Sequence, residues 1–328
     1  MGPGSVMTLE QLSPEAWSAF DEAHKAPTFF ARPAWATALA QAIPALQAAA
    51  LRVRVNGETY VLPTVHAAGR RTPFREYLAF PLGGYTCVLD EHARAAPPSQ
   101  AEAVISSVAQ RVDRLNVIPW PLAPSAAPVQ RIERVHETAV IDCSGGFDAV
   151  MNGMRGVTRR MAEQATRRGV TCVRASAREL PLYYEMLKAA SARWPLGRPT
   201  ISYALFARVL QYGGEDAQLW FARTDGRAVA GGIVLFGAQE LFFWSAAMDR
   251  DAARYRPSNA LNVALLRAAC ERGVRWYNLG ASEGLHGVER FKADLGAESI
   301  LYREYDLRRP AFAWYERARR FVFAGHTC

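Results

Sequence analysis

The chain has 328 residues, half of them apolar, and a formal net charge of +8. This length suits two domains of ordinary size, and no apolar run reaches the roughly 20 residues that a membrane-spanning helix needs. The positive charge favours an anionic substrate or partner. The first residues lack the basic-then-apolar pattern of a secretory signal, so we expect a cytoplasmic protein without a membrane span.

Cysteine usage argues against a metal centre or a disulfide framework. The five cysteines are odd in number, scattered along the chain and never paired at zinc-binding spacing. We therefore predict no metal site. Basic residues are almost all arginine, which makes a lysine such as Lys292 more noticeable.

The first part of the chain reads as one α/β domain, 7–143. A short helix begins at Ser13-Pro14, because proline is common in the first turn of a helix. Asn56-Gly57 between two apolar runs predicts a β-hairpin. The expected elements are a helix at 34–43, strands at 48–55, 58–66 and 77–85, a helix at 100–115, and strands at 116–120 and 137–143.

The second part reads as another α/β domain, 144–309. Its centre is a strand, a helix that begins near Pro257, and a strand, which together predict a βαβ unit. The expected elements are helices at 147–168, 179–193 and 202–212, strands at 170–174, 218–223, 227–236, 239–248, 274–280 and 299–307, and a short helix at 290–296. A terminal helix at 310–323 is expected to pack on the first domain.

The expected helix at 147–168 is unusually basic. Its arginines are Arg155, Arg159, Arg160, Arg167 and Arg168. A solvated basic face is the common explanation for such a run. An anion-binding wall is the alternative, although the helix has no interleaved aromatic residues that would stack on bases.

The order of elements in the second domain resembles the GNAT acyltransferase fold, and the first domain resembles a shorter copy of it. Motifs along most of the chain are similar to those of the Fem-type tandem-GNAT transferases (FemA, FemB and FemX) and of CelD-like GNAT proteins. These motifs are Phe30-Ala31-Arg32-Pro33-Ala34-Trp35, Pro81-Leu82-Gly83-Gly84-Tyr85, the arginine-rich segment 155–169, Tyr255 to Leu261, and Gly284-Leu285 through Phe291-Lys292 to Gly296. The resemblance implies a tandem GNAT fold of two mixed-sheet α/β (α+β) domains.

The resemblance also implies transfer of an acyl or aminoacyl group, with either aminoacyl-tRNA or acyl-coenzyme A as the donor. An ordinary GNAT pyrophosphate loop has glycines where this chain has Pro257 and Asn259. Proline has no N–H to offer a phosphate, so coenzyme A is weakened as a donor but stays possible. Arg254, Arg256, Ser258 and Asn259 remain the candidate donor-binding residues.

Acyl transfer needs a group that stabilises an oxyanion and a group that takes a proton from the acceptor. Lys292 is the first candidate for the oxyanion; a plain surface lysine is the alternative. Glu283 and His286 are the candidates for proton removal, with Tyr255 and Ser258 as candidate relays. A surface loop residue without a catalytic role is the alternative for Glu283 and for His286. The candidate substrate-binding residues are Arg159, Trp194, Tyr203, His286 and Arg290. No nucleophilic Cys–His or Ser–His pattern stands out, so direct transfer is expected.

These features predict a Fem-like transferase (EC 2.3 class) that acts directly on an amine or hydroxyl acceptor. The expected partners are a small-molecule or cell-envelope-precursor acceptor and, if the donor is aminoacyl-tRNA, that RNA. Two other interpretations stay open. One is an acyl-CoA-dependent N-acyltransferase for a sugar, amino acid or secondary metabolite; the other is a non-catalytic module that binds a polyanion.

Overall fold

The computed structural model describes residues 8–67, 74–79, 82–123, 132–194 and 196–324. The chain divides into two compact units. Unit 1 comprises residues 1–26, 30–136 and 302–328, and unit 2 comprises residues 27–29 and 137–301. Within the described ranges, no helix combines the length and the apolar character needed to cross a membrane. Pro81, in the predicted glycine-pair motif, lies outside the described residues.

Unit 1 begins with an edge strand and two helices, followed by a long hairpin. The side chain of Ser13 accepts a hydrogen bond from Ala16 N, which fixes the start of the first helix. The elements are β1 (Thr8–Gln11), α1 (Pro14–His24), α2 (Pro33–Ala42), β2 (Leu46–Val55), β3 (Glu58–Ala67), β4 (Glu76–Leu78), α3 (Pro98–Ala109), β5 (Arg114–Val117) and the terminal helix α10 (Pro310–Ala324).

Unit 2 contains the same order of strands and helices, with additional elements at both ends. Its elements are β6 (Ile132–Asp142), α4 (Gly146–Gly153), α5 (Gly156–Arg167), β7 (Thr171–Ala175), α6 (Leu180–Ser191), α7 (Tyr203–Gly213), β8 (Ala217–Thr224), β9 (Arg227–Phe236), β10 (Glu240–Met248), the 3₁₀ helix η4 (Arg250–Tyr255), α8 (Pro257–Glu271), β11 (Trp276–Asn278), α9 (His286–Asp294) and β12 (Glu298–Arg308). The boundary between the units falls within β6 and β12.

Strand pairing in the two units follows one pattern. In unit 1, β1–β2, β2–β3 and β3–β4 are antiparallel and β4–β5 is parallel. In unit 2, β7–β8, β8–β9 and β9–β10 are antiparallel and β10–β11 is parallel. The next strand is exchanged: β12 pairs with β5 in unit 1, whereas β6 pairs with β11 in unit 2. The fold is therefore a tandem repeat in which each half of the chain supplies a strand to the other unit.

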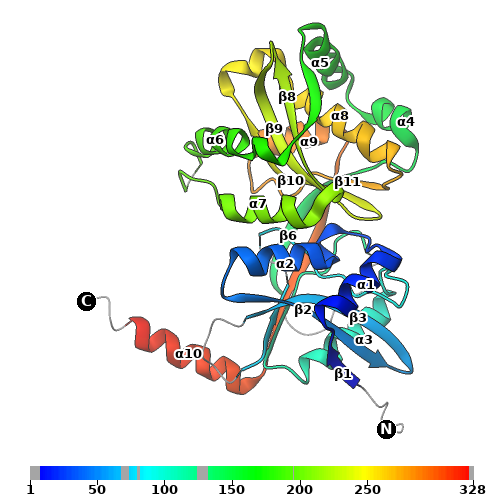
Figure 1. Ribbon diagram of the computed structural model, residues 1–328, viewed down its shortest axis with the longest axis vertical. Coiled ribbons are helices and arrows are strands. Elements are labelled where there is room, and N and C mark those ends of the chain that lie inside the picture. Colours follow the sequence, from blue (N-terminus) through cyan, green and yellow to red (C-terminus); the bar gives the residue numbers. More distant parts are fainter. Residues whose placement is uncertain (1–7, 68–73, 80–81, 124–131, 195, 325–328) are drawn as a thin grey trace. The chain divides into compact units, whose positions relative to one another are not determined.

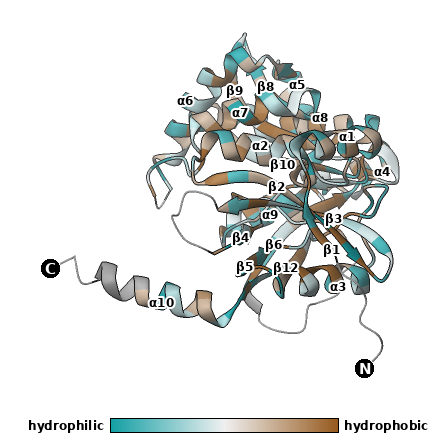
Figure 2. Ribbon diagram, turned by 60° about the horizontal axis from the view of Figure 1, so that its bottom comes forward, coloured by the Kyte–Doolittle hydropathy of each residue, from teal (hydrophilic) through white to brown (hydrophobic). Residues whose placement is uncertain are grey.

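Helices cover both faces of the unit 2 strands (Figure 1). Successive side chains of a strand point to opposite faces, and β8 shows which helices lie on each. Trp220 packs in the core under α8, whereas the ring of Phe221 lies 6.5 Å from that of Tyr183 on α6. Helix α8 therefore lies on one face of the strands, and α6 on the other. Apolar residues concentrate on the strands, while the helices carry both kinds of residue (Figure 2).

Unit 1 buries a carboxylate in its sheet. Asp306 of β12 accepts a 2.6 Å contact from Arg114 of the paired strand β5, and the Asp306 side chain is 2 % exposed. Burial raises the pKa of Asp306, but hydrogen bonds from Arg114 and Arg308 outweigh it and leave that pKa below the ordinary value. The exchanged strand is thus tied to unit 1 by a buried ion pair as well as by backbone bonds.

Several predicted boundaries were wrong. The basic helix expected at 147–168 is two helices, because Met154 is extended and Arg155 N donates to Asp294 O, 3.1 Å away. The strand expected at 77–85 ends at Leu78, and the helix expected to reach residue 115 ends at Ala109. The short helix expected from Arg290 begins at His286.

Candidate active site

The parallel strands β10 and β11 of unit 2 pair over only three residues. Glu240, Leu241 and Phe242 lie opposite Trp276, Tyr277 and Asn278, although β10 continues to Met248. A register shift between Phe243 and Ser245 on the β9 side marks the point where β10 changes direction. The strands therefore part at their carboxyl ends, which is where α/β proteins place ligands.

Lys292 reaches this point from helix α9. Its Nζ donates to the carbonyl oxygens of Gly280 and Ala281, each 2.8 Å away, just after β11 ends. The residue is 6 % exposed. Burial lowers the pKa of Lys292 to about 8, against the opposing effect of Glu137, Glu283 and Glu289. Lys292 is thus a buried ammonium that anchors the loop after β11, which excludes the plain surface lysine considered above.

A network of buried hydrogen bonds around Asn278 fixes the end of β11. Asn278 Oδ1 accepts from Thr138 Oγ1 at 2.6 Å and from Gly280 N at 2.9 Å. Its Nδ2 donates to Glu240 Oε1 at 2.7 Å. Gly280 has a φ of +70°, a conformation that favours glycine. These hydrogen bonds fix the positions of the two carbonyl groups that Lys292 contacts.

Ser282 lies two residues beyond Gly280 and was missed by sequence reasoning. It is 3 % exposed, and its hydroxyl has no hydrogen-bond partner among the described residues. A buried polar group without a partner is uncommon and calls for an explanation. Ser282 follows Ala281, whose carbonyl receives Lys292, so the hydroxyl is a candidate substrate contact.

The rest of the loop is exposed. Glu283 has a φ of +51° and lies at the surface, while His286 is 97 % exposed and contacts Glu289 at 3.1 Å. Arg290 is also exposed. A non-glycine residue with positive φ often marks a functional turn. The charges of Glu283 and Glu289 both act on Lys292 and oppose the lowering of its pKa.

The turn into helix α8 contains the four candidate donor-binding residues. The backbone of Arg256 has the left-handed conformation, with a φ of +58°. Arg254 and Arg256 are both exposed. Ser258 Oγ contacts Met248 Sδ at 3.2 Å, so its hydroxyl turns back to the end of β10. Asn259 is 8 % exposed and its N–H donates to Arg256 O at 3.1 Å.

Backbone donors in this turn are largely satisfied within it. Asp251 N bonds to Asp249 Oδ1 at 3.0 Å, and Arg256 N bonds to Ala253 O at 3.0 Å. Pro257 has no N–H. A phosphate cradle needs several free N–H groups that point at the ligand. This turn offers Ser258 N and the arginine side chains instead. Tyr255 OH accepts from Arg254 at 3.0 Å and is therefore tied to the turn.

The candidate substrate-binding residues are not brought together. Arg159 donates to Met151 O at 3.0 Å and lines a cavity of about 690 Å³ with Trp220 and α8. Tyr203, in contrast, packs its ring 5.4 Å from Tyr184 of α6, on the other face of the strands. Trp194 follows α6 and is 39 % exposed. Arg159 therefore lies apart from the other two.

A cleft of about 720 Å³ lies on the α6 face, where β10 ends. Leu182 and Met186 of α6 form an apolar wall, and Met248 reaches it from β10. Arg250 lies at the rim. Because Met248 also contacts Ser258, this cleft adjoins the start of α8.

The comparisons with known proteins agree with this geometry. Residues 152–293 match the family model described as an acetyltransferase (GNAT) domain. Unit 2 has the GNAT fold. No curated protein matches the chain in sequence. In the part of the chain that the structure describes, no group of three or more His, Cys, Asp or Glu residues is placed to hold a metal ion.

Among solved structures, FemX matches with a TM-score of 0.71 and 12 % identity, over 94 % of this chain and 99 % of that chain. A conserved protein of unknown function from Bacteroides thetaiotaomicron matches with a TM-score of 0.53 and 8 % identity, over 93 % and 100 %. A tandem GNAT protein from the clavulanic acid biosynthesis pathway matches with a TM-score of 0.48 and 13 % identity, over 92 % and 98 %. At these identities, the likeness to FemX and to the Bacteroides protein shows the fold. The predicted tandem GNAT fold and its resemblance to Fem-type proteins are confirmed at that level.

Proposed function

We propose that unit 2 catalyses direct transfer of an acyl or aminoacyl group to an amine or hydroxyl acceptor. The observation that carries the proposal is the buried Lys292 ammonium at the point where β10 and β11 part, in a domain that matches the GNAT family. A donor carbonyl between the parted strands would lie beside this charge. Transfer reactions of this kind are accelerated by fixed hydrogen-bond donors or positive charges beside the developing oxyanion.

Lys292 would stabilise that oxyanion. An ammonium has three N–H donors, and two of them are used on the carbonyls of Gly280 and Ala281. The third is available for an oxyanion, while the two fixed bonds hold the ammonium in place. The acceptor nitrogen or oxygen attacks the donor carbonyl, the oxyanion collapses, and the donor's carrier leaves. The acceptor's proton would pass to Glu283, with the Ser282 hydroxyl as a further contact.

The donor is proposed to be an aminoacyl-tRNA, as in Fem-type enzymes, and the acceptor a small amine or a cell-envelope precursor. The turn before α8 supports aminoacyl-tRNA over coenzyme A. Most backbone N–H groups of this turn bond within the turn, so few are free to bind a pyrophosphate. Acyl-coenzyme A remains the second candidate, since the GNAT match covers 152–293 and Arg254 and Arg256 are exposed beside the turn.

A polyanion-binding module without catalysis has less support. Four of the five arginines of the α5 region are used inside unit 2, and one of them, Arg167, lies 3.8 Å from Glu163. Arg155 pairs with Asp294 at 2.8 Å, Arg159 donates to Met151 O, and Arg168 donates to Arg254 O. Such contacts leave less free positive charge for a polyanion than the sequence suggested.

Ligand-dependent stabilisation tests the donor. A ligand that binds only the folded state raises the melting temperature. We expect charged tRNA to raise it and coenzyme A or acetyl-coenzyme A to leave it unchanged. A clear rise with either coenzyme would instead establish the second candidate.

Single-turnover transfer from the donor so identified tests the chemistry. Lys292→Met should lower the rate by about 10²–10³, the usual cost of removing an oxyanion donor. Lys188→Met is the matched control, because Lys188 is a surface lysine paired with Glu185 at 2.6 Å. Equal rates for Lys292→Met and wild type would overturn the role of Lys292.

A further inference from the structure

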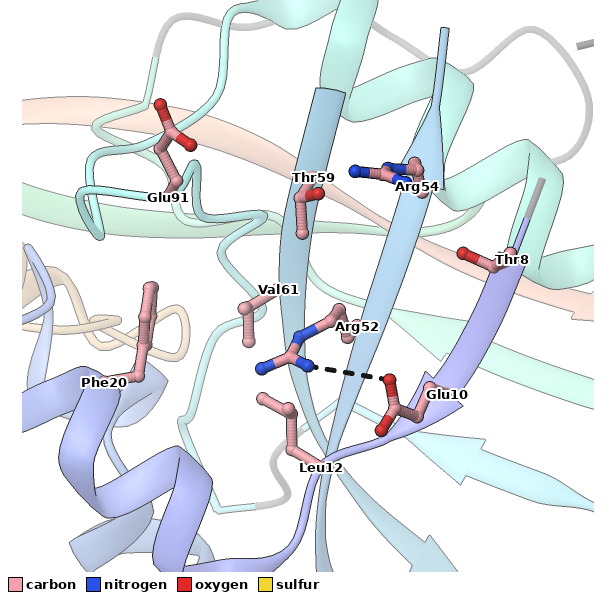
Figure 3. A pocket seen from close by; sticks show the side chains of 9 residues that line it. All are labelled: Thr8, Glu10, Leu12, Phe20, Arg52, Arg54, Thr59, Val61 and Glu91. Carbon is pink, nitrogen blue, oxygen red and sulfur yellow. Dashed lines mark ion pairs between the residues drawn. The ribbon is translucent and has the colours of Figure 1, made fainter. Parts of the chain in front are cut away.

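Unit 1 contains a pocket of about 480 Å³ on the face of its sheet that points away from α3 (Figure 3). Its walls come from β1, β2 and β3, with Phe20 of α1 on one side. The opposite face of the same strands, including Val53 and Leu62, is buried in the core with α3. The pocket therefore lies on a sheet face that α1 covers only in part.

Strand register arranges the pocket in two rows. Thr8 lies opposite Arg54, and Arg54 lies opposite Thr59, so two hydroxyl residues flank one guanidinium. Neither threonine side chain is hydrogen-bonded, and no carboxylate pairs with Arg54, within the described residues. Figure 3 shows the Arg54 side chain directed toward Thr59. The two hydroxyls and the guanidinium are therefore hydrogen-bond donors that can bind a ligand.

The second row combines an ion pair with an apolar residue. Glu10 lies opposite Arg52, and Arg52 lies opposite Val61. The Arg52–Glu10 contact is 3.6 Å long with side chains 46 % and 64 % exposed, so it is a weak surface ion pair. Leu12 and Phe20 complete this end of the pocket, and Glu91, which lies 3.7 Å from His92, is the remaining lining residue. Because two residues along a strand span about 7 Å, the polar row and the apolar end are one aromatic ring apart.

The equivalent hairpin of unit 2 has an arginine at the corresponding position, and that arginine is paired within the protein. The turn Asp225-Gly226 has φ values of +49° and +76°, and Asn56-Gly57 has +53° and +86°. Each turn follows an arginine by two residues. In unit 2 that arginine, Arg223, pairs with Glu179 and donates to Gly226 O at 3.2 Å. Arg54 has no such contacts, although the two turns are alike; the unit 2 hairpin differs by a register shift between Ala222 and Arg223.

We propose that this pocket of unit 1 binds a small phosphate monoester that carries an aromatic or apolar group. The guanidinium of Arg54 and the hydroxyls of Thr8 and Thr59 would hold the phosphate, since arginine suits an oxyanion with several acceptors. The apolar group would lie against Phe20, Leu12 and Val61. Arg52 adds a second positive charge beside the phosphate. This site is separate from the acyl-transfer site and does not depend on its chemistry.

Calorimetric titration of the full chain with phenyl phosphate tests the proposal. Wild type should bind phenyl phosphate, and more weakly inorganic phosphate. Arg54→Gln should weaken phenyl phosphate binding about tenfold or more, the effect of one lost charge-assisted hydrogen bond. The affinity of Arg54→Lys for phenyl phosphate should lie between those of wild type and Arg54→Gln. Arg160→Gln is the matched control, because it removes an exposed arginine of α5 in unit 2 and should leave binding unchanged.

A second variant separates the two ends of the pocket. Phe20→Ala should weaken phenyl phosphate and leave inorganic phosphate binding as it was. Circular dichroism spectra that match wild type will show that the variants are folded. Absence of binding to wild type at about 10 mM phenyl phosphate, weaker than any specific site of this kind, would overturn the proposal. Equal loss in Arg54→Gln and Arg160→Gln would also overturn it, because binding would then be a general effect of charge.

Discussion

Replacement of Lys292 by methionine should change stability in a way that depends on pH. The wild-type ammonium makes two charge-assisted hydrogen bonds of 2.8 Å, each worth roughly 1.5–3 kcal/mol. Its burial offsets part of this, because a pKa lowered from 10.5 to about 8 disfavours the charged form by about 3 kcal/mol. We therefore expect Lys292→Met to lower the free energy of unfolding by only about 1–3 kcal/mol at pH 7.

The pH dependence is the sharper test. Between pH 8 and 10.5 the unfolded chain holds a proton on Lys292 that the folded chain has released. Stability rises with pH wherever the unfolded state binds more protons. Wild type should therefore gain about 1–2 kcal/mol relative to Lys292→Met between pH 7 and pH 9.5.

Urea unfolding of both proteins at the two pH values measures this gain. Lys188→Met, which removes an exposed lysine, should show no such change. A constant difference between wild type and Lys292→Met from pH 7 to pH 9.5 would refute the reasoning, since Lys292 would then keep an ordinary pKa.

Two further substitutions test the packing of each unit. Asp306→Asn should destabilise the protein by about 2–4 kcal/mol in urea unfolding, because it leaves the guanidinium of Arg114 short of a buried counter-charge; a loss below 0.5 kcal/mol would contradict this. Gly232→Ala should cost about 2–4 kcal/mol, because the new Cβ would lie 2.6 Å from Ser245 O, a backbone atom that cannot rotate away. Gly153→Ala has open space at the Cβ position and should be close to neutral, so similar melting temperatures for the two alanine variants would argue against the packing described for β9 and β10.

The sequence was most informative where structure is local. Ser13-Pro14 predicted the start of α1, and Asn56-Gly57 predicted the hairpin of β2 and β3. The break between α4 and α5 could not be predicted in this way. It depends on a bond from Arg155 N to Asp294 O, between residues that are far apart in the chain. The tertiary contact overrides a run of residues that favour a helix.

The site shows the same division between local and distant contacts. Lys292 was predicted as a functional residue from its motif, but the carbonyls that hold it depend on how β11 ends. Asn278 bonds to Glu240 from a neighbouring strand and to Thr138 from an exchanged strand. No local pattern indicates pairs at these separations. A short strand that ends in Asn-x-Gly is the signal that could have drawn attention to this position.

The GNAT match and the structural unit have different limits. The match begins at residue 152, whereas unit 2 begins its main segment at residue 137. The residues of unit 2 that precede the match include the part of β6 that pairs with β11. This part carries Thr138, which bonds to Asn278. Without that strand, β11 would be an edge, and the network of buried hydrogen bonds that fixes its end would lose a member. The loop that Lys292 anchors is therefore held partly by residues outside the matched domain. A tandem repeat with exchanged strands ties the candidate active site of unit 2 to the chain that leaves unit 1, even though the residues of the proposed chemistry belong to unit 2.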